Sequence, residues 1–248
     1  MSTIYILWLR GLKHYFRSRA HIVASLGQPL LYLLVLGFGL GPVFQKAGQG
    51  NYLQFMAPGV IAMTVLFASI SSGLNLIWDR QFGFLKEMLV APVPRSHLMI
   101  GRALSGASVA MLQGVLVLAV CMMAGFRPTH LVGLPQGLLW MSLIAIVFSS
   151  LGTAIGSRLE SLQALQMVMS FLVMPLFFLS GALYPLSGLP ASLHYITSVN
   201  PLSYGVDGLR SALIGISHFA PLADFTVLAV FAVVFVTFGA WSFSRIEL

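Results

Sequence analysis

Few side chains in this sequence could carry out covalent chemistry, and they do not form a catalytic pattern. Ser180 precedes Gly181 after an apolar run, which could present a serine nucleophile within a membrane. Such a serine needs a neighbouring base, but His194 and His218 both fall in a later segment. The six histidines show no metal-ligand spacing, and no glycine-rich phosphate loop precedes a Lys-Ser or Lys-Thr pair. We therefore expect no catalytic residue, no metal site and no cofactor on this chain, and an intramembrane enzyme is the weakest hypothesis.

The stretch Asp79–Arg102 lies between two long apolar runs and is rich in charged residues. Its charged side chains are Asp79, Arg80, Lys86, Glu87, Arg95 and Arg102. One short amphipathic helix is predicted over Arg80–Val90, because apolar residues recur there at helical spacing: Phe82, Leu85, Met88 and Leu89.

A proline elbow follows this predicted helix. Pro92 and Pro94 each lack an N–H and restrict the preceding residue, so they end the helix. Ser96 can cap a following helix that begins at His97. A compact amphipathic helix, a rigid elbow and a new apolar run together favour a docking element, with an ordinary charged loop as the alternative.

The composition is that of a membrane protein. Hydrophobic residues make up 58% of the chain and charged residues 8%, whereas soluble domains carry roughly a quarter charged residues. The net charge of +7 fits Lys and Arg facing anionic lipid headgroups. No basic run is interleaved with exposed aromatic residues in a soluble segment, so we expect no nucleic-acid partner. Cys121 is the only cysteine, which excludes an intrachain disulfide.

The first residues, Thr3–Arg19, predict an amphipathic helix lying in the membrane interface. Its polar face carries Arg10, Lys13, His14 and Arg17 at helical spacing. The opposite face carries Ile4, Trp8, Leu12, Tyr15 and Phe16. The alternative is a plain charged N-terminus, which the clean separation of the two faces disfavours.

Six membrane spans follow, each judged against the roughly 20 residues needed to cross a bilayer. They are predicted at Ile22–Phe44, Phe55–Ile77, Leu98–Ala124, Leu134–Gly156, Leu162–Leu183 and Leu222–Phe243. No long polar linker interrupts them, so we expect a single all-α polytopic domain over residues 1–248. If the N-terminus is cytoplasmic, all 13 lysines and arginines except Lys46, Arg127 and Arg210 face the cytoplasm. This bias predicts cytoplasmic termini and a cytoplasmic Asp79–Arg102 stretch.

The segment Tyr184–Pro221 between the last two spans is apolar and rich in helix breakers. It predicts a helix over Leu189–Ser198 and a second over Pro201–Ile214, capped by Asn200 and ended by Gly215. Neither is long enough to span, so we expect a half-buried, re-entrant hairpin on the outer side. Asp207 and Arg210 can pair at i, i+3. A surface loop on the lipid headgroups is the alternative.

The span interiors carry no convincing ionisable residue. Ion-driven carriers commonly need such groups or broken helices in paired halves. Either the protein is passive or its energy comes from another subunit. A docking helix favours the second possibility.

Three motifs carry a family resemblance. They are YLQFMAPGVIAM (Tyr52–Met63) with FLKEMLVAPVP (Phe84–Pro94), PLFFLSGALYPLSGLP (Pro175–Pro190) and NPLSYGVDGLR (Asn200–Arg210). In order and spacing they resemble the permease subunits of type-2 ATP-binding-cassette exporters, closest to the daunorubicin-resistance and nodulation-factor branch. The resemblance covers essentially the whole chain.

This resemblance implies an export permease in the cytoplasmic (inner) membrane. A second permease copy, as a homodimer, and two ABC ATPase subunits that bind ATP and Mg²⁺ would be its partners. The N-terminal helix with Arg10, Lys13 and Arg17 would be a connecting helix, and residues 184–221 an outer gate. The coupling residues would be Arg80, Gly83, Leu85, Glu87, Leu89, Pro92, Pro94 and Arg95. The gate residues would be Tyr184, Pro185, Asn200, Pro201, Tyr204 and Arg210.

The expected substrate is hydrophobic or amphipathic, namely a drug, a lipid or a glycolipid. The resemblance carries over no substrate-contacting residue. A passive channel or a membrane assembly scaffold without ATPase coupling is the alternative function.

Overall fold

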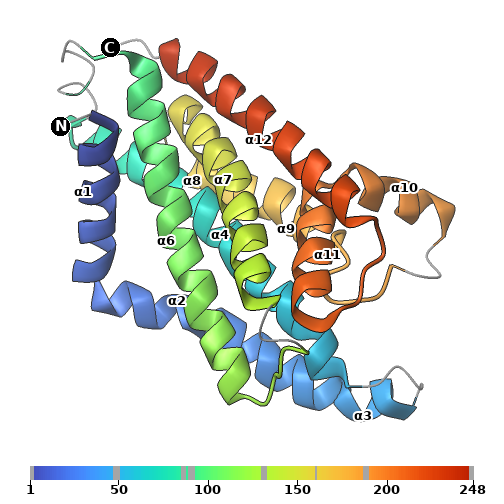
Figure 1. Cartoon of the computed structure of the whole chain (residues 1–248). Helices are drawn as coiled ribbons and strands as arrows, with labels where there is room; N and C mark the ends of the chain where they lie inside the picture. Colours follow the sequence, from blue (N-terminus) through green and yellow to red (C-terminus); the bar gives the residue numbers. More distant parts are fainter. Residues whose placement is uncertain are drawn as a thin grey trace.

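The computed structural model describes residues 3–46, 51–84, 88, 93–129, 133–159, 161–186 and 190–245. Within these ranges every regular element is a helix, which confirms the all-helical prediction (Figure 1). The elements are α1 (Thr3–Arg17), α2 (Arg19–Leu31), η1 (Tyr32–Phe38), α3 (Gly39–Lys46), α4 (Tyr52–Gln81), α6 (Arg95–Met123), α7 (Gly133–Arg158), α8 (Leu162–Val168), η2 (Met169–Val173), α9 (Met174–Phe178), α10 (Ala191–Val199), α11 (Pro201–Ile214) and α12 (Pro221–Ser244). Of these, η1 and η2 are π-helical.

The described part of the chain contains 5 helical stretches that are long and apolar enough to cross a membrane. They are Ile22–Lys46, which joins most of α2 to η1 and α3, followed by α4, α6, α7 and α12. The protein is therefore a multi-pass membrane protein.

The predicted span Leu162–Leu183 differs from the observed helix. The continuous run of α8, η2 and α9 ends at Phe178, so it is an apolar helix of fewer than 18 residues. At 1.5 Å per residue it is about 25 Å long, against a hydrocarbon core of about 30 Å. The helix ends because Gly181 turns the chain with φ of 71°, and Ser180 donates its hydroxyl to the Phe177 carbonyl. A sixth crossing here stays a prediction.

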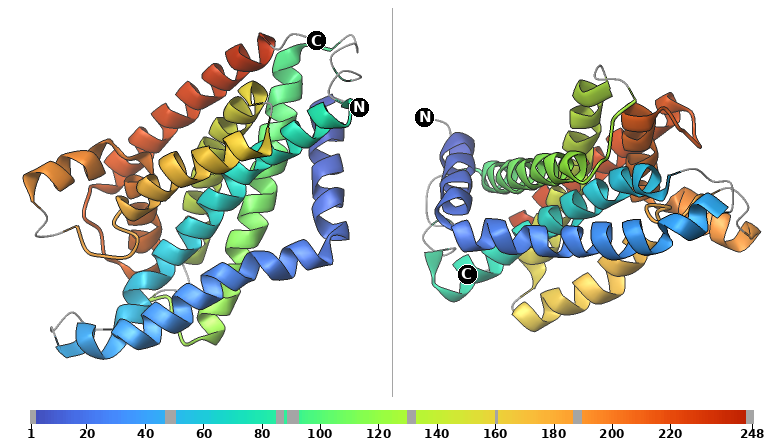
Figure 2. Two further views of the ribbon diagram at one scale, coloured as in Figure 1. Left: turned by 180° about the vertical axis from the view of Figure 1, so that it is seen from behind. Right: turned by 90° about the horizontal axis from the view of Figure 1, so that it is seen from below.

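The long helices α4, α6, α7 and α12 form a bundle, and α1 lies along one side of α6 (Figure 1). After α1 the chain turns sharply, and the rod of α2, η1 and α3 runs across the bundle (Figure 2). The short helix α11 packs against α4, α7 and α12, while α10 extends away from the bundle. The start of α1 and the end of α12 lie at the same end of the bundle as the start of α6.

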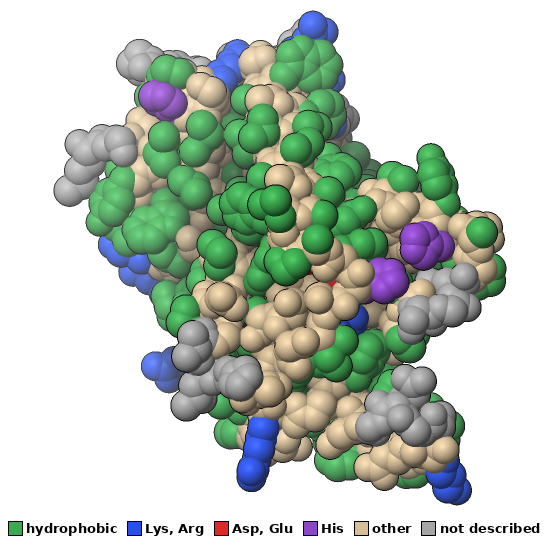
Figure 3. Space-filling model, turned by 45° about the vertical axis from the view of Figure 1, so that its right-hand side comes forward, with side chains coloured by type: hydrophobic (Ala, Val, Ile, Leu, Met, Phe, Trp, Pro, Cys, Tyr) green, Lys and Arg blue, Asp and Glu red, His purple; other side chains and the backbone are tan. Residues whose placement is uncertain are grey.

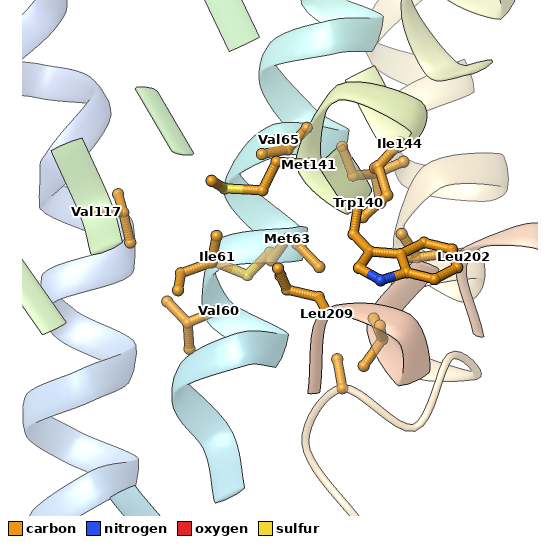
Figure 4. Close-up of a cluster of buried hydrophobic side chains, with 14 of the residues drawn as sticks. Val60, Ile61, Met63, Val65, Val117, Trp140, Met141, Ile144, Leu202 and Leu209 are labelled. Atoms are coloured by element: carbon orange, nitrogen blue, oxygen red, sulfur yellow. The ribbon is translucent and has the colours of Figure 1, made fainter. Parts of the chain in front are cut away.

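The core lies where α4, α7 and α11 meet. Figure 4 shows side chains of α4, including Ile61 and Met63, between Met141 of α7 and Leu209 of α11. Ile61 and Leu209 are fully buried. The outer face in Figure 3 is largely apolar, and the Lys and Arg side chains in this view gather mainly at its margins. A surface of this kind fits lipid as the surrounding solvent.

Helices α4 and α7 touch through glycines. A Cβ atom added to Gly73 would lie 2.3 Å from the Gly152 carbonyl oxygen, and one added to Gly156 would lie 2.6 Å from the Gly73 oxygen. Small residues four apart, as Gly152 and Gly156 are, allow membrane helices to approach closely. Beside this contact, Ser149 donates to the Ala103 carbonyl of α6 over 2.6 Å and so joins the third helix.

We predict that Gly73→Ala destabilises the protein by about 1–3 kcal/mol, because overpacking forces backbones apart. Gly27→Ala is the matched control, since a Cβ there meets nothing within 4 Å. It should leave stability unchanged or raise it by about 0.5–1 kcal/mol through helix propensity. Thermal unfolding in detergent measures both variants. Equal melting temperatures for the two would contradict the close α4–α7 contact.

Candidate functional site

The buried carboxylate of Asp79 ties three helices together at the end of α4. One of its oxygens, Oδ1, accepts a hydrogen bond of 3.2 Å from Arg10 of α1. The other, Oδ2, accepts a hydrogen bond from Arg102 of α6. The side chains of Asp79 and Arg102 are only 12% and 14% exposed, whereas that of Arg10 is 49% exposed. The pair with Arg102 is therefore the desolvated one, and Arg10 joins it from the rim.

Arg80, the next residue, binds the end of α7. Its guanidinium donates to the carbonyl oxygens of Ser157 and Leu159, each over 3.0 Å. These carbonyls belong to the last turn of α7 and the residue after it, where backbone acceptors lack helical partners and the helix dipole favours a cation. Arg80 thus caps α7 and fixes the end of α4 against it.

The predicted helix Arg80–Val90 is wrong at its start. Arg80 lies inside α4, which continues to Gln81 and is followed by Phe82 as its C-cap. Gly83 then adopts φ of 79°, a left-handed conformation that glycine accepts without strain. The contact of Arg80 with α7 stabilises the last turn of α4, which extends past the predicted span end at Ile77. Any helix in this stretch begins only after Gly83.

Several predicted coupling residues lie outside the described residues, namely Leu85, Glu87, Leu89 and Pro92. Met88 is described, and Arg102 donates to its sulfur over 3.7 Å. Met88 also packs on a small apolar cluster that includes Leu7 of α1 and Phe243 of α12. The stretch after Gly83 therefore touches the same end of the bundle as Asp79.

The start of α6 also differs from the prediction. The helix begins at Arg95 with Pro94 in the N-cap position, and no side chain caps it. Ser96 therefore lies within the first turn instead of capping it. Proline suits this boundary because it needs no N–H partner. Arg95 donates to the Ser244 carbonyl over 2.8 Å, which links α6 to the end of α12.

Helix α1 packs on α6 with part of its predicted apolar face. Tyr15 is buried, and the Trp8 indole donates to Ser108 over 2.9 Å. Phe16 is 59% exposed, so the predicted stripe does not pack as one surface. Lys13 and Arg17, from the predicted polar face, line a cavity of about 780 Å³ together with the end of α4. The placement of α1 in a membrane interface stays a prediction.

In the predicted outer gate, Arg210 is 4% exposed and holds the turn after α9. It donates to the Gly181 carbonyl over 2.9 Å, and its guanidinium lies 4.1 Å from the centre of the Phe55 ring. Burial lowers the pKa of Arg210 to about 10, while the charge of Asp207 acts in the opposite direction. The side chain therefore stays charged at neutral pH and joins α4, α11 and the turn.

The predicted ion pair between Asp207 and Arg210 is wrong. Asp207 instead accepts hydrogen bonds from the backbone N–H groups of His218 and Phe219, at 2.8 to 2.9 Å. These donors lie in the loop between α11 and α12, where backbone N–H groups have no helical acceptor and need another partner. Asp224 of α12 is also fully buried, and neither of its carboxylate oxygens has a hydrogen-bond partner in the described part of the chain.

The other predicted gate residues lie on or beside α11. Asn200 caps this helix through the Leu202 N–H and also donates to the Leu176 carbonyl of α9 over 2.7 Å. Pro201 is the first residue of α11, whose predicted bounds are confirmed. Tyr204 stacks on Phe219 with ring centres 4.7 Å apart. The remaining two, Tyr184 and Pro185, are half-buried in the loop after α9.

Ser180 does not have the environment of a nucleophile. It is buried, donates to the Phe177 carbonyl and accepts from the Ala182 N–H. Both contacts hold the turn that ends α9. Among the described residues, no group of three or more His, Cys, Asp and Glu could hold a metal ion.

Sequence reasoning singled out neither Asp79 nor Arg102 as a functional residue. The signal was present, because Asp79 is one of the chain's six acidic residues and lies among cations at the end of a span. The sequence could not predict that Arg10 and Arg102 contact Asp79, because these two partners lie on two other helices.

The long apolar helices and the Asp79 contacts that join α1, α4 and α6 define a multi-pass helical membrane protein. Its sequence matches the family described as ABC-2 type transporter over residues 2–214. The chain belongs to this family of transport permeases.

Three relatives show the range of this likeness. The ycf38 protein of Cyanophora paradoxa is 31% identical over 196 residues, which cover 76% of this chain and 66% of the relative. The chain thus spans about two thirds of that relative. The inner membrane transport permease YadH of Escherichia coli K12 is 27% identical over 231 residues, 92% of this chain and 90% of YadH. Nodulation protein J of Rhizobium leguminosarum bv. viciae is 26% identical over 213 residues, 85% and 79% of the two chains.

We predict that Asp79→Asn lowers the free energy of unfolding by about 3–5 kcal/mol, because it leaves the buried Arg102 without a counter-charge. Arg10→Gln should cost at most about 1 kcal/mol, since an exposed ion pair contributes little. Chemical or thermal unfolding in detergent measures both.

The double variant Asp79→Asn/Arg102→Met is the control. It removes the unpaired charge and should recover part of the lost stability. A double variant less stable than Asp79→Asn by the full cost of Arg102→Met alone would show that the two side chains are not coupled.

Proposed function

We propose that the chain is the membrane subunit of an ATP-driven exporter that pairs with two separately encoded ATPase subunits and a second copy of itself. Family membership supports this proposal, because the matched residues 2–214 cover most of the chain. The observation that carries the coupling role is the position of Asp79. It joins α1, α4 and α6 just before the Gly83 turn.

Coupling would work through the segment that follows Gly83. An ATPase that displaced this segment would move α6 through the contact of Met88 with Arg102. The ion pairs of Asp79 with Arg102 and Arg10 would carry the same displacement to α4 and α1. The residues proposed to meet the ATPase are Leu85, Glu87, Leu89, Pro92, Pro94 and Arg95. In the same proposal α1 is the connecting helix, with Lys13 and Arg17 on its exposed side.

The loop after α9, together with α10 and α11, would close the outer end of the pathway. Arg210 supports this role because it joins α11 to the Gly181 carbonyl and to Phe55 of α4. A movement of α4 would therefore displace α11 and the turn after α9, which form part of the proposed gate. The proposed gate residues are Tyr184, Pro185, Asn200, Pro201, Tyr204 and Arg210.

The proposed setting is the cytoplasmic membrane, with both termini and the Asp79–Arg102 stretch on the cytoplasmic side. In the structure the start of α1 and the end of α12 lie at the same end of the bundle, which supports placing both termini on one side (Figure 1). The helix Leu162–Phe178 would complete six crossings. The substrate would be a hydrophobic or amphipathic molecule such as a drug, a lipid or a glycolipid.

The test reconstitutes the chain with its ATPase in vesicles and measures ATP hydrolysis and transport together. Glu87→Arg should leave hydrolysis running and lower transport at least tenfold, because it reverses a charge at the proposed contact. Lys46→Glu, a charge reversal on α3, should change neither. Unchanged transport in Glu87→Arg would remove the coupling role from this segment. Full transport without ATPase or nucleotide would instead support a passive channel.

A further inference from the structure

The cavity of about 780 Å³ beside Asp79 has one basic wall and one aromatic wall. Lys13 and Arg17 of α1 line the basic wall. Trp78, Phe82 and Phe84, at and after the end of α4, line the aromatic wall. The cavity lies at the end of the bundle that holds the Asp79 contacts.

Among the described residues that line this cavity, cations outnumber carboxylates. Its one described carboxylate lining group, Asp79, already binds Arg10 and Arg102. Lys13 and Arg17 add two further cations with no acidic partner among the described lining residues. Both are exposed, so they can reach a ligand. The electrostatic complement of this wall is an anion.

The exposed rings of the aromatic wall can bind an apolar group of a ligand. Phe82 is 67% exposed, Phe84 48% and Trp78 39%. Trp78 and Phe82 are stacked, with ring centres 5.6 Å apart and planes 8° from parallel, so they form one contiguous aromatic pair. Contiguous exposed apolar surface of this kind marks a binding site. A free phosphate ion would satisfy the cations but would leave these rings in water.

The cavity continues into the bundle. A second cavity of about 390 Å³ shares Gly11, His14, Asn75 and Trp78 with the first and extends between α2, α4 and α6. Its deeper lining includes the uncharged polar side chain of Gln113. The two together form one crevice with a cationic mouth, an aromatic side and a depth lined by apolar and uncharged polar side chains. An amphiphile with an anionic headgroup fits this order of surfaces.

We propose that this crevice binds an anionic phospholipid, with its phosphate at Lys13 and Arg17 and its apolar part against Trp78 and Phe82. The assignment goes beyond the proposed export function and does not depend on ATP coupling. It also gives α1 a specific ligand in place of a general affinity for charged membrane surfaces.

The test reconstitutes the purified chain in phosphatidylcholine nanodiscs that contain brominated phosphatidylglycerol or brominated phosphatidylcholine. Bromine on the acyl chain quenches nearby tryptophan fluorescence. We expect stronger quenching by the brominated anionic lipid, and Trp78→Phe should remove most of the difference. Lys13→Gln/Arg17→Gln should lower the relative affinity for phosphatidylglycerol about 30-fold, at roughly fivefold per charge.

Lys46→Gln is the matched control, because it removes an exposed cation from α3 and should keep the lipid preference. Wild-type protein at rising salt gives a second measurement that is independent of how any variant folds. The preference should weaken as salt screens the two exposed cations.

Three outcomes would overturn the proposal. The first is equal quenching of the wild-type protein by the two brominated lipids. The second is a preference that survives in Lys13→Gln/Arg17→Gln or falls equally in Lys46→Gln. The third is displacement of phosphatidylglycerol by millimolar inorganic phosphate, which would show a free-anion site in place of a lipid site.

Discussion

The close approach of α4 to α7 is the contact on which the other contacts of the bundle depend. In a bilayer the lipid tails are as apolar as leucine, so helices associate through van der Waals packing instead of a hydrophobic driving force. Gly73, Gly152 and Gly156 let backbone meet backbone at this crossing. The same crossing places Asp79 and Arg80, a few residues further along α4, beside the ends of α6 and α7. A side chain at Gly73 would shift both of them.

Away from the contact between Gly73, Gly152 and Gly156, arginine guanidinium groups join the helices. Arg80 binds the end of α7, and Arg95 binds the end of α12. Arg158 donates to Ser242 of α12 over 2.8 Å. Each bond to a terminal carbonyl satisfies a backbone acceptor that the helix itself leaves unpaired. At the opposite end of the bundle, Arg210 likewise donates to a backbone carbonyl, that of Gly181. These arginines therefore contribute directly to the packing of the helices.

Local signals predicted the features that depend on neighbouring residues. Helix α11 has the predicted bounds because Asn200, Pro201 and Gly215 act within a turn of where they stand. Composition and periodicity were likewise sufficient for the all-helical class and for the long apolar helices, because each of these is a property of one segment.

Non-local contacts account for what sequence reasoning missed. The end of α4 moved past the predicted span because Arg80 reaches carbonyls of α7. The i, i+3 spacing of Asp207 and Arg210 was correct, but backbone groups elsewhere compete more effectively for both side chains. The Asp79 contact joins residues 10, 79 and 102, and no spacing rule connects positions so far apart.

The two π-helical stretches have a consequence for how this family can vary. A π turn closes i→i+5 bonds and holds one residue more than an α turn. A relative that lacks one residue within η1 or η2 can close that stretch into regular α-helix and keep both flanking segments in phase. One residue lost from a regular α-helix would instead rotate everything beyond it by about 100°. Loss of one residue should therefore disturb the packing little at Tyr32–Phe38 or Met169–Val173. The same loss along α4 or α7 should disrupt the packing of that helix.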